Sequence, residues 1–430
     1  MTRDVYQFRP LNLGRWLLWS AFAFVLLMAP HVFTSSLSLT MLSQMGTAII
    51  VCLSYNMLLG QGGMLSFGHA VYSGLGAFAA IHTLNKVGAG EWAVPVSLIP
   101  IIGGLAGLLV ASLLGAVTTK KSGNTFAMIT LGVGELVWNM SLMLPEFFGG
   151  EGGISSNRVV GHPFMGITFG PQIQVYYLIA VYCFICTVLM FAFTQTPLGR
   201  MLNAVRDNPE RVEFIGYDTQ RVRYFAFMIA GFFAGVAGGL YAINFEIVTA
   251  EVVGAQRSGA YLLFTFLGGS LFFFGPIIGA VLLVLASVML SELTKAWLLY
   301  LGLVFLFMVM FAPGGIASLL MMNVRVAAHG LLRRLLASYA ALAVTGAAVV
   351  AVFAAMVEMV YHIKLNEALG PMMKFAGMEL NTRSGQTWAV AVVALLVGVG
   401  LFELVRRRFA RQWHQIQEEI EARLARVPVV

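Results

Sequence analysis

The chain has 430 residues, of which 59% are hydrophobic and 10% are charged, and its formal net charge at pH 7 is +7. A soluble domain usually carries about 25% charged residues, so this composition excludes an ordinary soluble protein and indicates an integral membrane protein. Since a membrane-spanning helix needs about 20 apolar residues, the chain has room for ten or more spans joined by short loops.

Long continuous apolar runs predict an all-α, polytopic helical bundle of about ten to twelve spans. In chain order we expect spans at residues 16–34, 37–59, 67–84, 92–118, 125–144, 173–194, 223–245, 258–271, 277–291, 297–317, 336–358 and 386–405. With the N-terminus inside, 19 of the 26 Lys and Arg residues fall on the inside and 7 fall outside, which predicts that both termini are cytoplasmic. The positive net charge is therefore a sign of membrane topology and not of nucleic-acid binding.

Glycine interrupts the predicted spans at two places, residues 60–69 between the second and third spans and residues 268–276 between the eighth and ninth. Broken backbone at membrane depth needs burial in protein or a watery cavity, and paired breaks are typical of a translocation path. Close helix packing explains each single glycine equally well, and a hydrogen-bonded packing role is favoured for the histidine of the first break. The candidate pathway residues are Gly60, Gln61, Ser66, Gly68, His69, Gly268, Gly269, Gly275 and Pro276.

Of the 19 acidic residues, only Glu135 falls in the middle of a predicted span. An acid at membrane depth is a functional-site hypothesis, and a structural hydrogen bond to a neighbouring helix or to Asn139 is the favoured alternative. An ion-driven carrier usually has several such groups, so a single one argues against a stand-alone secondary transporter.

A polar island at residues 198–216 separates the spans at 173–194 and 223–245. Leu198, Met201, Leu202 and Val205 recur at the spacing of one apolar helix face. Pro197 is placed to begin this helix, and residues 208–209 (Asn-Pro) to end it and begin another. A cytoplasmic amphipathic helix is suited to docking in a partner's groove, although a solvated loop whose arginines only obey topology remains open. The candidate docking residues are Gly199, Arg200, Met201, Leu202, Val205, Arg206, Asn208 and Gly216.

Motifs for chemistry are missing from the sequence. It has no G-x-x-x-x-G-K-[ST], H-E-x-x-H or G-x-S-x-G, so we expect no ATP-binding loop, no metal site, no catalytic residues and no enzyme activity in this chain. Cys52, Cys183 and Cys186 all lie in apolar segments and are interpreted as packing residues.

Several of these blocks resemble LivM-type permeases, which are membrane subunits of branched-chain amino acid ABC importers of the hydrophobic amino acid uptake family. The similar blocks occur in order between about residues 37 and 320. They are residues 56–70 with Gly74 and Gly76, residues 125–131, residues 149–154, residues 199–216, residues 232–242, residues 267–280 and residues 311–315.

The resemblance implies a LivM/LivH-type permease fold in which residues 198–216 contain the coupling helix that fits an ATPase groove. It implies a homologous LivH-type second permease, two cytoplasmic ABC ATPases that hold ATP and Mg, and a periplasmic substrate-binding protein. The chain itself then needs no cofactor, lies among lipids in a bacterial inner membrane and binds no nucleic acid. The outside loop at 144–172 either faces the binding protein or only connects two spans.

We therefore expect a permease subunit that forms half of the translocation path for branched-chain or related amino acids. The alternatives are a stand-alone ion-coupled secondary transporter, or the same ABC role with urea, an amide or an aromatic acid as substrate. Three parts are predicted: residues 1–36 with the first span, the ABC permease core at 37–326, and a C-terminal extension at 327–430. The extension lies beyond the resemblance and contains two further spans and a charged cytoplasmic tail.

Overall fold

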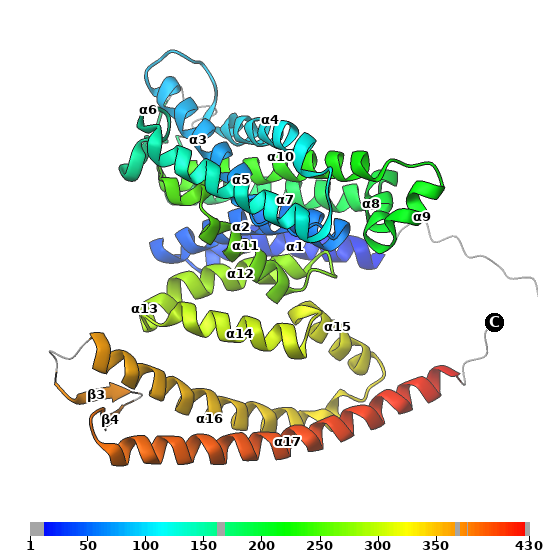
Figure 1. Cartoon of the computed structure of the whole chain (residues 1–430), viewed down its shortest axis with the longest axis vertical. Helices are drawn as coiled ribbons and strands as arrows, with labels where there is room; N and C mark the ends of the chain where they lie inside the picture. Colours follow the sequence, from blue (N-terminus) through cyan, green and yellow to red (C-terminus); the bar gives the residue numbers. More distant parts are fainter. Residues whose placement is uncertain (1–12, 161–167, 366–369, 376, 426–430) are drawn as a thin grey trace, which may run out of the picture. The chain divides into compact units, whose positions relative to one another are not determined.

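The computed structural model describes residues 13–160, 168–365, 370–375 and 377–425, and these residues form mainly helices (Figure 1). The elements in chain order are α1 (Leu13–Val32), α2 (Ser36–Gly62), α3 (His69–Gly88), η1 (Val96–Leu98), α4 (Ile99–Thr118), α5 (Gly123–Met143), α6 (Pro145–Phe148), η2 (Gly150–Gly152), β1 (Ile154–Ser155), α7 (Gln172–Gln195), α8 (Pro197–Asp207), α9 (Pro209–Phe214), α10 (Thr219–Phe245), β2 (Ile247–Val248), η3 (Ala250–Val253), α11 (Ala255–Gly268), α12 (Gly275–Leu285), η4 (Ala286–Leu290, π-helical), α13 (Ser291–Leu293), α14 (Trp297–Phe311), α15 (Gly315–Ala328), α16 (Leu332–Leu365), β3 (Met372–Phe375), β4 (Met378–Asn381) and α17 (Gly385–Ala425). The predicted all-α membrane fold is confirmed.

Each predicted span coincides with a helix. In the described part of the chain, 8 helices are long and apolar enough to cross a membrane, or up to 9 if the bent pair α14 and α15 counts as one span. The predicted spans that this count leaves out coincide with α1, α3 and α11. Helix α11 has only 14 residues, or about 21 Å of rise, which is less than the roughly 30 Å of a bilayer's apolar core.

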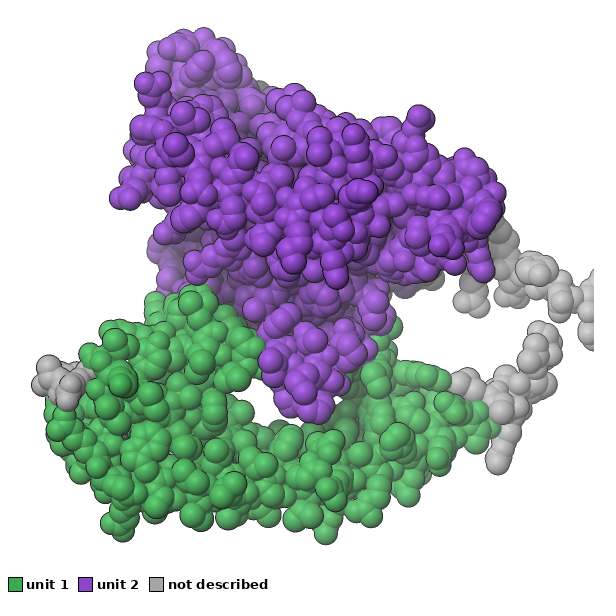
Figure 2. Space-filling model, in the orientation of Figure 1, with its two compact units in different colours: residues 1–8, 290–303, 319–430 green, residues 9–289, 304–318 purple. Residues whose placement is uncertain are grey.

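The chain divides into two compact units (Figure 2). Among the described residues, unit 2 contains 13–289 and 304–318, and unit 1 contains 290–303 and 319–425. Helices α14 and α15 each contribute to both units. The boundaries predicted at 36 and 326 stay a prediction; the contacts divide the chain at other positions because residues 290–303 pack with the C-terminal helices.

Unit 2 is built around α10, which packs closely on α3 and α4. Glycine makes this possible, since a Cβ on Gly76 of α3 would lie only 2.7 Å from the carbonyl oxygen of Gly235 in α10. A Cβ on Gly103 of α4 would lie at the same 2.7 Å from that oxygen. Without a hydrophobic driving force between helices in lipid, such small-residue contacts allow backbones to approach and pack.

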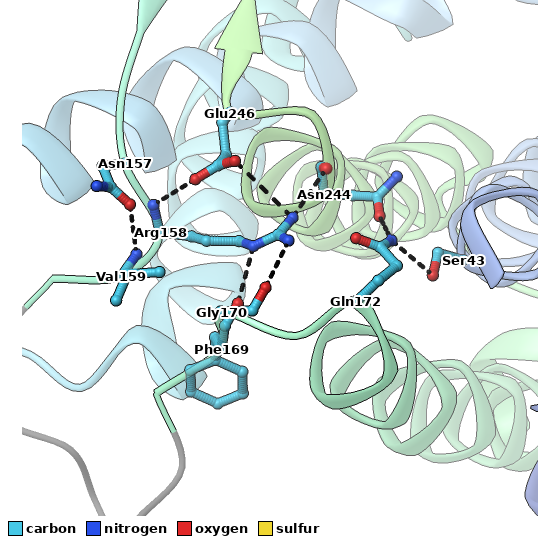
Figure 3. Close-up of polar contacts among 9 residues, drawn as sticks. All are labelled: Ser43, Asn157, Arg158, Val159, Phe169, Gly170, Gln172, Asn244 and Glu246. Atoms are coloured by element: carbon cyan, nitrogen blue, oxygen red, sulfur yellow. Dashed lines mark hydrogen bonds and ion pairs between the residues drawn. The ribbon is translucent and has the colours of Figure 1, made fainter. Parts of the chain in front are cut away.

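The C-terminal end of α10 is tied to the long loop that precedes α7 (Figure 3). Strand β1 pairs antiparallel with β2, with Ile154 opposite Val248. The largely buried Arg158 donates to the carbonyl oxygens of Phe169 (2.8 Å) and Gly170 (3.0 Å), and its backbone N–H donates to the Glu246 carboxylate (2.8 Å). The described part of this loop is therefore fixed to the end of α10 and to β2, and a role in facing a binding protein stays a prediction.

Unit 1 contains the two long helices α16 and α17, which lie side by side as a hairpin (Figure 1). With 34 and 41 residues they rise about 51 and 61 Å, which is far more than a bilayer needs. Beyond the membrane-length part, a small apolar cluster joins them to the end of α15; its buried members are Val326, Leu331, Leu335, Ile416 and Ile420. The predicted outside loop between them contains the antiparallel pair β3–β4.

Candidate functional site

The first glycine break is a short non-helical segment between α2 and α3, and α2 ends sharply before it. Gly63 ends α2 in the left-handed conformation (φ 62°), and its N–H and that of Met64 donate to the carbonyls of Leu59 and Leu58. Within it Met64, Ser66 and Gly68 are buried, Leu65 and Phe67 are partly exposed, and residues 67–68 form a turn. The break is therefore ordered backbone that this subunit covers on one side.

A buried polar cluster holds this segment in place. His69 is fully buried and its Nε2 lies 2.9 Å from Ser54 Oγ, while the Tyr55 hydroxyl donates to the Ser66 carbonyl (2.9 Å). His69 Nδ1 and Ser66 Oγ have no hydrogen-bond partner among the described residues. The structure thus places His69 in a packed, hydrogen-bonded position, which is the role that the sequence interpretation favoured.

The second break joins α11 and α12 through backbone in close contact. Gly269 ends α11 with φ 113°, and Pro276 lies at the start of α12. Side chains on Gly268 or Gly275 would overlap the facing backbone of the same turn, so both glycines are required by packing. The structure brings the two breaks together, since a Cβ on Gly60 would overlap the carbonyl oxygen of Ser270.

Helix α8 begins and ends at the residues that the sequence predicts. Pro197 begins it behind Thr196, whose Oγ1 accepts from Gly199 N–H (3.2 Å), and Asn208 caps α9 by accepting from Arg211 N–H (3.0 Å). The structure confirms an amphipathic helix here, with Gly199, Leu202 and Val205 buried and Arg200 exposed. Met201 is partly buried, and Gly216 supplies an exposed turn with φ 89°.

The apolar face of α8 points into this subunit, and this corrects the prediction that the face enters a partner's groove. Leu202 is 0% exposed and packs on Gly62 of α2. A Cβ built on Gly62 would lie only 3.1 Å from the Cδ1 of Leu202. Val205 is 5% exposed. Spacing shows that a helix has an apolar face but does not show whether that face meets its own chain or another.

The residues that sequence reasoning missed lie just after α9. Phe214 is 90% exposed, Ile215 is 62% exposed and Tyr217 is 50% exposed. Exposed aromatic and aliphatic side chains grouped in a polar loop are typical anchors of protein–protein contacts. The available signal in the sequence was the group Phe-Ile-Gly-Tyr within an otherwise charged segment.

Helix α8 is joined to the first break by polar contacts. Asn203 Nδ2 donates to Gln61 Oε1 (2.9 Å), and the Arg206 guanidinium donates to the carbonyl oxygen of Gly60. That oxygen belongs to the last turn of α2, where carbonyls lack helical partners and a positive charge stabilises the helix end by about 0.3–1 kcal/mol. Helix α8 therefore contacts α2 at the point where the two breaks meet.

Glu135 lies on the surface of the subunit, in the middle of α5. Asn139 Nδ2 donates to the backbone carbonyl of Glu135 (2.7 Å), and the Glu135 side chain has no hydrogen bond or ion pair with any described residue. The favoured structural role was a hydrogen bond to a neighbouring helix or to Asn139; among the described residues only the backbone carbonyl of Glu135 is bonded, to Asn139.

The described residues contain no group of three or more His, Cys, Asp or Glu side chains that could hold a metal ion. Cys52, Cys183 and Cys186 are free and buried, which agrees with their interpretation as packing residues.

Comparisons with known proteins identify the family. The model of the family described as branched-chain amino acid transport system / permease component matches residues 37–313. The chain is 28% identical over 289 residues to the high-affinity branched-chain amino acid transport system permease protein LivM of Salmonella typhimurium, covering 62% of this chain and 67% of that protein. The protein of the same name from Escherichia coli is 28% identical over 292 residues, with the same coverage.

A shorter similarity links the chain to the guanosine ABC transporter permease protein NupQ of Bacillus subtilis, at 30% identity over 69 residues, or 16% of this chain and 22% of that one. No solved structure matches the chain. Since the family model covers both glycine breaks and helix α8, the chain belongs to the branched-chain amino acid transport permease family and is a multi-pass membrane permease subunit.

Proposed function

We propose that this chain forms half of the translocation path of a binding-protein-dependent ABC importer for branched-chain amino acids. ATP is hydrolysed on two separate cytoplasmic subunits, a homologous second permease supplies the other half of the path, and a periplasmic protein delivers the substrate. The observation that carries the proposal is the family match over residues 37–313, which contains the two breaks in contact and the cytoplasmic helix attached to them.

The attachment to the ATPase is assigned to the loop between α7 and α10. Helix α8 presents Arg200 on its outer face, and the exposed Phe214, Ile215 and Tyr217 follow α9. We assign these aromatic and aliphatic side chains as the anchors in the ATPase groove, because α8 itself buries its apolar face against α2. The cytoplasmic position of this loop is supported by its five arginines between 200 and 223.

The test is transport by the whole complex in liposomes. The two permeases and the ATPases are purified together, ATP is enclosed, and radiolabelled leucine is added outside with the binding protein. We expect saturable leucine uptake that requires both ATP and the binding protein. Uptake driven by an ion gradient without ATP would contradict the assignment to an ABC importer. Uptake of guanosine in place of leucine would contradict the proposal that the substrate is a branched-chain amino acid.

A further inference from the structure

The exposed carboxylate of Glu135 lies deep in a membrane span. Helix α5 is a candidate span of 21 residues, and Glu135 is about 18 Å along its roughly 31 Å length. The side chain is exposed on the subunit and has no partner among the described residues. A carboxylate facing lipid at this depth is strongly unfavourable, so this face of α5 borders water or another polar group in the assembled transporter.

The same part of α5 packs on the first glycine break. Thr130 Oγ1 accepts a hydrogen bond from Phe67 N–H (3.1 Å). A Cβ on Gly134 would lie 3.5 Å from the Cα of Gly68. Glu135 therefore follows directly after the residues that hold the break, and Phe67 is itself partly exposed.

The surface around Glu135 combines one negative charge with apolar neighbours. On α5, Leu136 is 59% exposed and Trp138 is 36% exposed, and a Cβ on Gly132 would meet no atom within 4 Å. An acid beside open apolar surface matches a small zwitterion with a hydrophobic side chain, because the acid can pair with the ammonium group while the side chain contacts the apolar part.

We propose that Glu135 lines the translocation path and binds the ammonium group of the amino acid as it passes the first break. This inference rests on the proposed function, since it places the path along the exposed face of α5 next to the second permease. It assigns a residue of this chain to substrate recognition during translocation, separately from the selection made by the binding protein.

Thiol labelling tests whether the Glu135 position faces the path, without depending on transport. The three native cysteines of this chain are buried, so E135C adds one accessible thiol to this chain, and its labelling is read from the band of this subunit after the complex is separated. We expect a membrane-impermeant methanethiosulfonate reagent to modify this variant, and leucine delivered by the binding protein to slow the reaction. The matched control is L109C, which replaces a 62% exposed apolar side chain in the middle of α4 and should stay unmodified in lipid.

Kinetics of the isosteric variant Glu135→Gln test the binding role. We expect assembly and the maximal rate of ATP hydrolysis to be kept, while the apparent KM for leucine rises about tenfold, which corresponds to loss of about 1.4 kcal/mol. Glu135→Asp should recover part of the affinity. An unmodified thiol, modification that leucine does not slow, or an unchanged KM would each overturn the inference. A wild-type complex that imports no leucine would instead contradict the proposed function.

Discussion

Gly68 shows at the scale of one residue why the break cannot carry a side chain. A Cβ at this position would overlap the carbonyl oxygen of Thr130. The sequence located the glycines of both breaks, but it did not distinguish a pathway role from close packing, because both roles use the same residue. For Gly68, Gly268 and Gly275 the structure gives packing as the immediate reason for glycine.

We therefore predict that Gly68→Ala destabilises the subunit by about 1–3 kcal/mol, because the methyl group forces apart two backbone segments. Gly132→Ala on the facing helix is the control: its Cβ would meet nothing within 4 Å, and alanine is the better helix former. Thermal unfolding of the purified subunit, followed by tryptophan fluorescence, measures both. If the two variants had the same melting temperature, the break would be able to accommodate a methyl group at residue 68.

Arg158 is the second residue whose contribution to local stability can be measured by substitution. Its guanidinium satisfies the carbonyls of Phe169 and Gly170, and its backbone binds Glu246. We predict that Arg158→Gln leaves two half-buried carbonyls without their partner and weakens the loop before α7 by about 2 kcal/mol. Faster hydrogen exchange at residues 153–160 is the measurement. Lys374→Gln, which removes an exposed ion pair to Glu379, should leave exchange there unchanged.

At the scale of elements, the sequence predicts that α8 is a helix with one apolar face, but it does not predict what that face packs against. The helix, its start at Pro197 and its end at Asp207 follow from local signals in the sequence. The side on which it packs depends on α2, more than 130 residues earlier in the chain, which no local pattern encodes. The contact of Leu202 with Gly62 is such a long-range pairing.

This difference gives a paired prediction. Val205→Asp places a charge in the core of the subunit, so we expect the permease itself to lose thermal stability. Phe214→Asp changes a 90% exposed side chain, so the permease should insert and melt normally but lose the ATPases. Copurification of the ATPases and melting of the isolated permease distinguish the two outcomes. A Val205→Asp subunit that is stable and fails only to bind the ATPases would instead support docking through the apolar face of α8.

The bond from Arg206 to the Gly60 carbonyl predicts a loss of coupling. Arg206→Ala removes the bond from α8 to the carbonyl of Gly60, so movements of α8 reach the breaks only through the remaining contacts of Asn203 with Gln61 and of Leu202 with Gly62. We expect ATP hydrolysis and assembly to continue while leucine uptake per ATP falls, and Arg206→Lys to restore part of it. Arg221→Ala is the control, because that exposed side chain pairs with Asp218 at the start of its own helix. An unchanged ratio of uptake to hydrolysis in Arg206→Ala would exclude this connection.

At the scale of the whole molecule, the family match ends at residue 313 and leaves the C-terminal helices unassigned. Apolar runs in the sequence located α16 and α17, because span length is a strong signal. The pairing of their far ends was not predictable, since Leu335 and Ile420 lie 85 residues apart and meet only in the hairpin. Nor did the sequence show that residues 290–303 pack with the C-terminal helices.

Truncation after Val326 tests whether the extension is an appended part. Unit 2 contains the two breaks and α8, so we predict that the truncated subunit still inserts, assembles and imports leucine. Its thermal stability should fall, because Val326 loses its buried cluster and Tyr300 loses the carbonyl of Ala354.

Two further measurements decide what the extension does. Leu335→Asp in the full chain disrupts the same buried cluster while keeping the β3–β4 loop, so it should match the truncated subunit in stability loss and in uptake. A truncated complex that assembles normally but imports no leucine, beside a Leu335→Asp complex that imports it, would assign the outside loop a direct role. Met372, Met373 and Phe375 would then be the adaptable contact surface for the binding protein or the second permease.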